Sequence, residues 1–284
     1  MEPQAGTLYV VGTPIGNLED MTFRAVRILQ EADRIAAEDT RHTGKLLQHF
    51  QIATPQISYH DHNRHSRTPE LLAILRQGQS VALVTDAGMP GISDPGYDLV
   101  KACREAGISV IAIPGASAVI TALSGSGLPT ERFVFEGFLP AKGTERRDRL
   151  ESLQSETRTI VLYESPHRLR QTLTDLSSCL GSDRPLVLAR ELTKMHEDWW
   201  QGTLLEAIAH FDHRDPQGEF TLVIAGSVQS QPLLSESALL AELEELLGQG
   251  LSRSQASRQL AQRTPLSRRQ IYQLALSIPD SQSS

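Results

Sequence analysis

One stretch of the chain combines residue types that suit ligand binding: residues 84–96 read VTDAGMPGISDPG, at the end of an apolar run. Its glycines allow the backbone to approach a ligand closely and to adopt positive φ, and its prolines stiffen the loop. Asp86 and Asp94 supply hydrogen-bond acceptors at fixed positions. Such a loop suits a small polar ligand with an amine, hydroxyl groups or a positive charge, because a polyphosphate would require basic residues without nearby acids.

Two further loops carry groups that could bind or activate a ligand. In EDTR, residues 38–41, Arg41 could hold a phosphate while Glu38 or Asp39 accepts a hydroxyl proton. A plain ion pair at the end of a strand is the alternative interpretation of this segment. PGASA, residues 114–118, follows an apolar run and opens a helix, so its backbone N–H groups could bind a carboxylate or a ribose edge.

Three other polar segments have less specific patterns. YESPHR, residues 163–168, is similar to EDTR in character; Pro166 suits the first turn of a helix, and the histidine and arginine are expected to face a cleft. HDHNRHSR, residues 60–67, matches no helical pair of metal ligands, and its arginines would repel a cation, so we interpret it as a substrate-facing loop and expect no metal. ARELTKMHE, residues 189–197, could be a charge network between domains or part of a catalytic site.

Apolar runs alternate with helical patterns through the first part of the chain, and Asp20 is expected to cap the first helix. This alternation predicts a largely parallel sheet that is covered on both faces. Ligands bind such sheets beyond the carboxyl ends of the strands, so GTPIGN, EDTR, the 84–96 loop and PGASA should lie along one rim. The expected strands are residues 8–11, 34–37, 57–59, 81–84 and 110–113.

A linker-like run at residues 124–130 separates this domain from a second set of strands, which we expect to form a mixed sheet. A polar hinge follows Gly226, and then a leucine stripe and two capping boxes predict helices that could form a helix-turn-helix. The predicted domains are residues 1–123, 124–228 and 229–284. The second set of strands is residues 133–138, 159–163, 186–189, 199–202 and 220–225.

Composition limits the classes of function. The 284 residues carry a net charge of -7, so nucleic acid would have to bind local basic patches, in Lys142–Arg149 and among the arginines of residues 249–272. Two cysteines exclude a disulfide framework. No signal peptide or spanning run is recognisable, which favours the cytoplasm and no membrane partner. Neither dinucleotide nor phosphate-loop fingerprints occur.

Eight motifs in register resemble the ribosomal RNA small subunit methyltransferase I family, a branch of the tetrapyrrole methylase superfamily. They are VGTPIGNLED, EDTR, TDAGMPGISDPG, PGASA, FEGFLP, YESPHR, ARELTKMHE and GEFTLVIAG. The resemblance implies an α/β fold: two α/β/α domains of the tetrapyrrole methylase type plus a small C-terminal helical extension. It also implies S-adenosyl-L-methionine as cofactor and methylation of the ribose 2′-hydroxyl of a cytidine in the decoding region of 16S rRNA, within the small ribosomal subunit, by a homodimer.

Carried over by position, the resemblance assigns roles to three sets of residues. Cofactor contacts would come from Asp86, Ala87, Gly88, Pro90, Asp94, Ser117, Ala118, Tyr163, Gly218, Glu219 and Phe220. Substrate contacts would come from Thr13, Pro14, Asn17, Thr40, Ser165, His167 and Arg168. Methyl transfer needs alignment, assisted by a base or a cation; the candidates are Glu38, Asp39, Arg41 and Lys194, and the sequence does not choose the base.

Two other functions fit parts of the sequence. A C-methyltransferase of tetrapyrrole precursors would share the fold, but such enzymes begin with a G-x-G-P-G type loop, whereas this chain has GTPIGN. A non-catalytic helix-turn-helix regulator would bind DNA without its first 226 residues. The RNA branch explains more of the motifs than either alternative.

Overall fold

The computed structural model describes residues 4–227, 236–261, 264 and 266–278. The chain forms two compact units, Met1–Ser227 and Val228–Ser284. The predicted domain limit between residues 228 and 229 lies outside the described residues. The limit between residues 123 and 124 falls within helix α5, Ala118–Gly125. The predicted domain limits therefore stay predictions.

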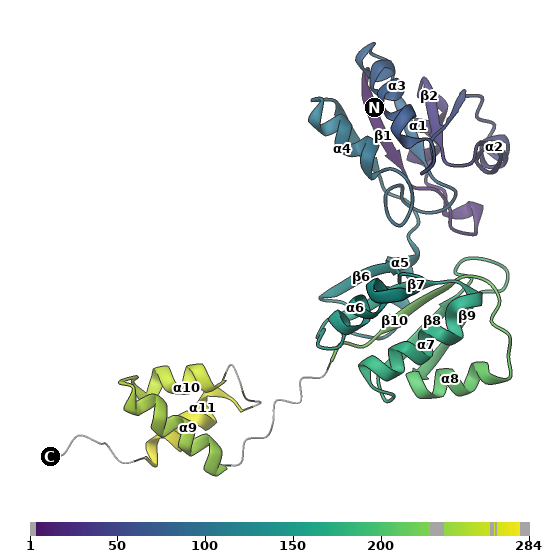
Figure 1. The fold of residues 1–284 in the computed structure, drawn as a ribbon. Helices are drawn as coiled ribbons and strands as arrows, with labels where there is room; N and C mark the ends of the chain where they lie inside the picture. Colours follow the sequence, from purple (N-terminus) through teal and green to yellow (C-terminus); the bar gives the residue numbers. More distant parts are fainter. Residues whose placement is uncertain (1–3, 228–235, 262–263, 265, 279–284) are drawn as a thin grey trace. The chain divides into compact units, whose positions relative to one another are not determined.

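Five parallel strands form the first sheet, in the order β3-β2-β4-β1-β5 (Figure 1). The strands are β1 Thr7–Val11, β2 Arg34–Ala37, β3 Gln56–Ser58, β4 Val81–Val84 and β5 Ser109–Ile113. The helices that connect them are α1 Phe23–Glu31, α2 Thr40–His49, α3 Arg64–Arg76 and α4 Tyr97–Glu105. The predicted parallel sheet is confirmed.

Alternate residues of each strand face opposite layers of helices, as the pleat of a strand requires. Tyr9 and Val11 belong to the hydrophobic cluster that includes residues of α1 and α2. Leu8 and Val10 belong to the cluster that includes residues of α3 and α4. The chain crosses the sheet in one direction through α1 and α2 and returns through α3 and α4, so right-handed crossovers cover both faces. This reversal places the crevice for ligands at the carboxyl ends of the strands.

The start of α1 differs from the prediction. Thr22, and not Asp20, is the N-cap, because Thr22 Oγ1 accepts a hydrogen bond from Ala25 N at 3.1 Å. Asp20 belongs to the short 3-10 turn Leu18–Asp20, which the side chain of Asn17 caps. Aspartate and threonine both cap helices well, so the residue type alone did not distinguish them.

The second sheet is mixed, as predicted, in the order β6-β7-β10-β8-β9. Only β6 and β7 pair in parallel; the other pairs are antiparallel. One face shares a hydrophobic cluster with α6 Gly143–Leu153, α7 Pro166–Leu180 and α8 Leu204–Asp212, and α5 packs on the other face (Figure 1). The strands are β6 Phe133–Phe138, β7 Thr159–Glu164, β8 Pro185–Arg190, β9 Asp198–Thr203 and β10 Phe220–Ile224.

The unit Val228–Ser284 contains the predicted helices α9 Glu236–Gly248, α10 Arg253–Ala261 and α11 Arg268–Leu276. The leucine stripe forms its core, where Leu239 and Leu243 are buried against α10 and α11. Both predicted capping boxes are present, at Ser252 and Ser267. None of the described helices is long and apolar enough to cross a membrane.

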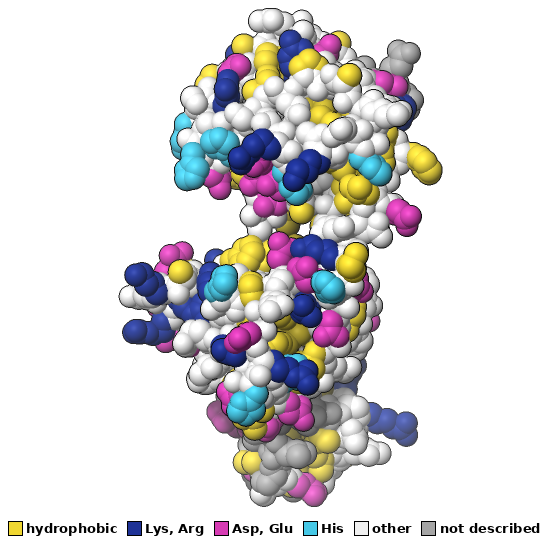
Figure 2. All heavy atoms as spheres, turned by 90° about the vertical axis from the view of Figure 1, so that its right-hand side faces the viewer, with side chains coloured by type: hydrophobic (Ala, Val, Ile, Leu, Met, Phe, Trp, Pro, Cys, Tyr) yellow, Lys and Arg dark blue, Asp and Glu magenta, His cyan; other side chains and the backbone are white. Residues whose placement is uncertain are grey.

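Two arginines of the predicted basic patches form hydrogen bonds within the fold instead. The side chain of Arg146 is buried and donates hydrogen bonds to Asp175 and Thr172. Arg253 donates to two backbone carbonyl oxygens at the end of α11. Burial thus removes Arg146 from any RNA-binding surface, and Arg253, which is partly buried, has its guanidinium group engaged by these carbonyl oxygens. On the face shown in Figure 2, basic and acidic side chains are interspersed, so no large field of one sign covers it.

Two glycines bring the carboxyl ends of β1 and β5 into backbone contact. A Cβ atom on Gly115 would lie 2.7 Å from Gly12 Cα, and a Cβ atom on Gly12 would lie 2.7 Å from Gly115 Cα. Because backbone atoms of two neighbouring strand ends make the contact, neither loop can move aside easily. Only glycine at both positions lets the loops 12–17 and 114–118 cross at this distance.

We expect Gly115→Ala to lower the free energy of unfolding by about 1–3 kcal/mol, because the added methyl group overpacks a rigid backbone contact. Gly44→Ala is the matched control, since a Cβ atom there would lie 3.7 Å from the nearest atom, Gln56 Nε2, inside α2. It should raise stability by about 0.5–1 kcal/mol through helix propensity. Urea unfolding followed by circular dichroism measures both, and effects of the same sign would contradict the close contact.

Candidate active site

A cavity of about 450 Å³, here the acidic cavity, opens at the carboxyl edge of the first sheet and extends to the ends of β7 and β10. Most of the predicted cofactor residues line it, but Pro90 and Gly218 do not. Sequence reasoning missed the apolar part of the wall; Phe138 lies in the FEGFLP motif, which could have indicated it. The lining includes Ile15, Glu38, Asp86, Ala87, Gly88, Met89, Ile92, Asp94, Ser117, Ala118, Phe138, Tyr163, Ser165, Glu219, Phe220 and Thr221.

A second cavity of about 540 Å³, here the α2 cavity, adjoins the first. Predicted substrate residues Thr13 and Pro14 line it, together with Lys194. The sequence did not indicate His42 and Lys45, which α2 also contributes; the available signal was that His42 follows EDTR directly and Lys45 lies one turn after it. Both cavities share Ile15, Asp86, Ala87 and Glu219 in their walls.

The loop 84–96 adopts the backbone that its glycines predicted. Gly88 and Gly91 have φ values of 78° and 83°, in the left-handed region that favours glycine. Gly88 also exchanges two backbone hydrogen bonds with Thr13, at 2.9 and 3.1 Å. This bridge joins the loop after β4 to the loop after β1, so two rim segments that are distant in sequence form one wall.

Reciprocal hydrogen bonds join the ends of β2 and β4. Glu38 Oε2 accepts from the backbone N–H of Asp86, and Asp86 Oδ1 accepts from the backbone N–H of Asp39, both at 3.2 Å. Each carboxylate therefore has one oxygen fixed by the neighbouring strand end. Both acids line the acidic cavity in this fixed arrangement.

The acids of this cavity disfavour one another's negative charge. Burial raises the pKa of Asp94 to about 7, and the charges of Glu38 and Asp86 add to the rise. Burial also raises the pKa of Glu38, and the nearby Asp86 carboxylate adds to that rise. A cationic ligand would relieve this repulsion, so the electrostatics of the cavity favour a bound positive charge.

Lys194 brings a cation to the wall of the α2 cavity, beside Glu219, which lines both cavities. Its Nζ donates to Glu191 at 3.0 Å and to Glu219 at 2.8 Å. Burial lowers the pKa of Lys194, but these two hydrogen bonds outweigh that effect and raise the pKa overall. The ammonium group is therefore held in its charged form and suits stabilisation of a negative charge rather than proton removal.

Asp39 and Arg41 form the ion pair that the sequence left open as an alternative, at 2.7 Å. The side-chain and backbone hydrogen bonds from Arg41 hold the pKa of Asp39 well below its usual range, and Asp39 also caps α2. A strongly stabilised carboxylate is a poor proton acceptor, which favours Glu38 over Asp39 as the base. Arg41 itself remains 89% exposed.

The other predicted substrate residues are dispersed. Ser165 lines the acidic cavity, and Pro166 begins α7 as predicted. His167 is exposed and lines neither cavity, and Arg168 donates to the carbonyl oxygens of Leu139 and Pro140. Thr40 is the first residue of α2 and also lies outside both linings. Within the described residues, no three histidine, cysteine or acidic side chains gather as a metal site would require.

We expect the stability of the ligand-free protein to depend on pH through Asp94. Its folded pKa of about 7 lies above the ordinary value of 3.8, so its contribution to stability is complete at low pH and is lost as the pH rises through about 7. Asp94→Asn removes this loss. The melting temperature of the variant relative to wild type should therefore increase between pH 5 and pH 8, as differential scanning fluorimetry can measure.

Asp148→Asn is the control for this prediction, because Asp148 is an exposed carboxylate of α6. Its melting temperature relative to wild type should change little over the same pH range. A constant difference for Asp94→Asn would contradict the raised pKa.

Comparison with known proteins shows the family to which the chain belongs. The chain matches the family model described as Tetrapyrrole (Corrin/Porphyrin) Methylases over residues 7–208. A protein of Synechocystis sp. named Ribosomal RNA small subunit methyltransferase I is 65% identical, covering 96% of this chain and 98% of that protein. Proteins of the same name from Halalkalibacterium halodurans and Escherichia coli O157:H7 are 48% and 51% identical, covering 95% and 82% of this chain and 94% and 82% of theirs.

Solved structures share the fold at lower identity. The uroporphyrin-III-C-methyltransferase from Thermus thermophilus has a TM-score of 0.56 at 23% identity, covering 77% of this chain and 94% of that one. A diphthine synthase has a TM-score of 0.60 at 15% identity, covering 77% and 89%. These likenesses show the arrangement of the two sheets and say nothing further about the substrate.

Proposed function

Because the chain belongs to the tetrapyrrole methylase family, in the branch named ribosomal RNA small subunit methyltransferase I, we propose that it methylates 16S rRNA. The methyl donor is S-adenosyl-L-methionine, and the acceptor is the ribose 2′-hydroxyl of a cytidine in the decoding region. The enzyme acts in the cytoplasm, as a homodimer, on the small ribosomal subunit. Close relatives of this name support the RNA substrate, whereas the likeness to porphyrin methylases is limited to the fold.

The single observation that carries the proposal is the pair of adjoining cavities with a common wall at Asp86, Ala87 and Glu219. Transfer between two bound molecules requires their reacting atoms to meet, and adjoining cavities bring this about. The acidic cavity takes the cofactor, and the α2 cavity takes the target nucleotide. The wall residues then lie beside the transferred group.

The residues of the acidic cavity fit S-adenosyl-L-methionine. When bound, this cofactor supplies a methyl group on a positively charged sulfur. Crowded carboxylates at Glu38, Asp86 and Asp94 complement a cation and accept hydrogen bonds from an amine or a ribose diol. The first turn of α5 has no side-chain cap from Ser117, so its N–H groups can bind a carboxylate. Phe138 and Ile92 offer apolar surface to a purine.

Two side chains assist the transfer: Glu38 accepts a proton, and Lys194 stabilises a negative charge. Glu38, with its raised pKa and one fixed oxygen, accepts the proton of the 2′-hydroxyl. Lys194, held in its charged form in the wall of the α2 cavity, stabilises the developing negative charge on the ribose oxygen. Glu219 positions this ammonium group and is common to both linings.

One edge of the α2 cavity is basic. Lys45 and His42 line it, and Arg41 lies in the first turn of the same helix with an exposed guanidinium group. When RNA binds, a phosphate of its backbone takes the place of the Asp39 carboxylate as the partner of the Arg41 guanidinium group. The contact orients the target strand, because phosphate contacts fix register while single-stranded bases are read by other groups.

We expect Arg41→Ala to lower RNA affinity about tenfold, because a hydrogen bond to a charged group contributes about 1.5–3 kcal/mol. Cofactor affinity should change by less than about twofold, since Arg41 does not line the acidic cavity. Arg76→Ala is the control: this exposed arginine ends α3, at the amino edge of the sheet, remote from the rim. Filter binding and calorimetry measure the two affinities; equal losses of both would refute the assigned role.

Mass spectrometry of rRNA fragments tests the function directly. Cells that lack the protein should lose one ribose-methylated cytidine of 16S rRNA, and the wild-type gene should restore it. Asp86→Ala should not restore it, because Asp86 lies in the wall of both cavities. Unchanged rRNA together with a porphyrinoid that lacks a methyl group would overturn the proposal in favour of a tetrapyrrole C-methyltransferase.

A further inference from the structure

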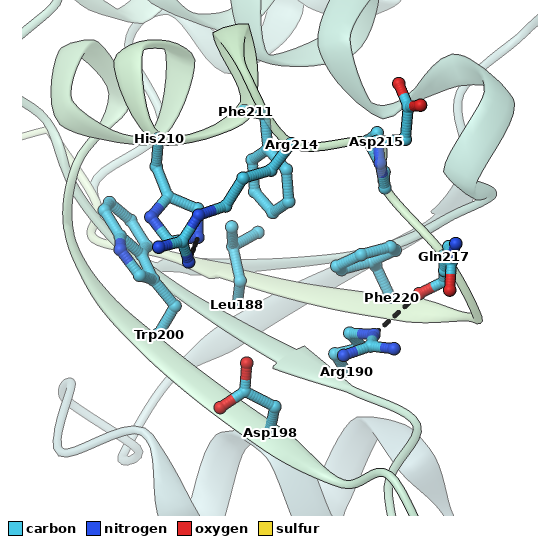
Figure 3. Close-up of a pocket in the computed structure, with 11 residues that line it drawn as sticks. Leu188, Arg190, Asp198, Trp200, His210, Phe211, Arg214, Asp215, Gln217 and Phe220 are labelled. Carbon is cyan, nitrogen blue, oxygen red and sulfur yellow. Dashed lines mark hydrogen bonds between the residues drawn. The ribbon is translucent and has the colours of Figure 1, made fainter.

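A third cavity, here the aromatic pocket, lies on the second sheet. It has a volume of about 290 Å³ and is formed by β8, β9, the start of β10, α8 and the loop after α8 (Figure 3). Phe220 is the only residue among the described linings that it shares with the acidic cavity. The proposed reaction leaves the aromatic pocket without a role.

An arc of four rings lines this pocket. The ring centroids are 5.5 Å apart for Trp200 and His210, 4.8 Å for His210 and Phe211, and 5.9 Å for Phe211 and Phe220. Buried Leu188 forms the floor between them (Figure 3). Flat apolar walls suit a planar ring, and the volume is at the small end of ligand sites, so one base fits better than a whole cofactor.

Arginines supply positive charge beside the rings. Arg214 contacts His210 Nε2 at 3.5 Å, and among the described residues it forms no ion pair with a carboxylate. The nearby Asp215 is instead bound by Arg170 at 2.9 Å, so its charge is already compensated. Arg190, opposite Asp198 in the adjacent strand, donates to Gln217 O at 2.7 Å. A guanidinium group is thus available beside an aromatic wall.

We propose that the aromatic pocket binds one nucleotide of the RNA substrate, with the base against Trp200 and its phosphate at Arg214. Proteins hold unstacked nucleotides in this way, by stacking on aromatic rings and pairing phosphates with arginine. A free di- or triphosphate would need a denser set of cations than this pocket contains. The inference rests on the proposed RNA substrate, and the bound nucleotide is one other than the methylated cytidine.

The pocket is connected to the active site through residues 217–220. Arg190 donates a hydrogen bond to the carbonyl oxygen of Gln217. Glu191, which follows Arg190, donates its backbone N–H to Glu219 O, and its side-chain Oε1 accepts from Glu219 N, both at 2.9 Å. Glu191 and Glu219 are also the partners of Lys194. A nucleotide in the aromatic pocket therefore contacts the same segment that positions the ammonium group. This places the second nucleotide where it can orient the target strand.

Fluorescence anisotropy with a labelled single-stranded oligoribonucleotide, measured on the full chain without cofactor, tests the pocket. Trp200→Leu and Arg214→Ala should each weaken binding about tenfold, within the range of one lost base stack. Trp200→Phe, which keeps a ring, should stay within about twofold of wild type. The matched controls are Trp199→Leu and Arg76→Ala, because neither side chain lines the pocket and Arg76 lies outside the predicted basic patches; both should bind as wild type.

Salt dependence separates the two contacts. Arg214→Ala should reduce the slope of log affinity against log salt by about 0.7, the value for one phosphate of a single strand, and Trp200→Leu should leave the slope unchanged. Wild-type affinity in both variants would overturn the pocket. Competition by cytidine monophosphate as strong as by the oligonucleotide would overturn the RNA assignment, because a free nucleotide would then be the ligand.

Methylation of isolated small ribosomal subunits by the wild-type enzyme is measured separately. If the wild-type enzyme methylates the subunits but Trp200→Leu and Arg214→Ala leave RNA affinity unchanged, the proposal that the aromatic pocket binds RNA is wrong and the proposed function stands. If both variants weaken RNA binding but the wild-type enzyme methylates no rRNA, the proposed function is wrong and the RNA contact of the aromatic pocket stands.

Discussion

The site depends on the hydrogen bonds that Glu38 and Asp86 exchange with each other's strand ends. They hold two carboxylates at one edge of a parallel sheet, where the strand order already brings β2 beside β4. The resulting repulsion would be costly in a cavity that stays empty of cations. Burial, with this repulsion added, raises the pKa of Asp94 to about 7, so the negative charge of the cavity depends on what it contains.

The two sheets contribute different kinds of group. The parallel sheet supplies acids and glycine-rich loops at the carboxyl ends of its strands, where backbone N–H groups and tight turns are available. The mixed sheet supplies Lys194 from a connection between antiparallel strands and aromatic side chains from β9 and β10. Charge neutralisation by Lys194 and Glu219 thus occurs where the contributions of the two sheets meet.

Local signals in the sequence predicted both sheets and the rim loops of the acidic cavity, because strand period, turn residues and rim position are properties of short segments. The family resemblance, and not a local signal, assigned Tyr163, Glu219 and Phe220 to the cofactor. Which distant residue a side chain or backbone group contacts is not a property of a short segment. The bridge between Thr13 and Gly88, the burial of Arg146 and the place of Lys45 in a cavity wall all depend on segments far apart in the chain. Likewise, Glu38 and Asp39 were both candidates for the base, and only the burial of Glu38 and the hydrogen bonds from Arg41 to Asp39 distinguish them.

The backbone contact between Gly12 and Gly115 also limits how this protein can change its substrate. A side chain at either position would meet the other loop, so the two positions can change only together with the path of both loops. Substitutions that alter specificity by single steps are therefore confined to residues such as His42 and Lys45, which border a cavity without supporting the crossing. The loop crossing must therefore be kept unchanged in evolution, whereas the residues that only border the α2 cavity can vary one at a time.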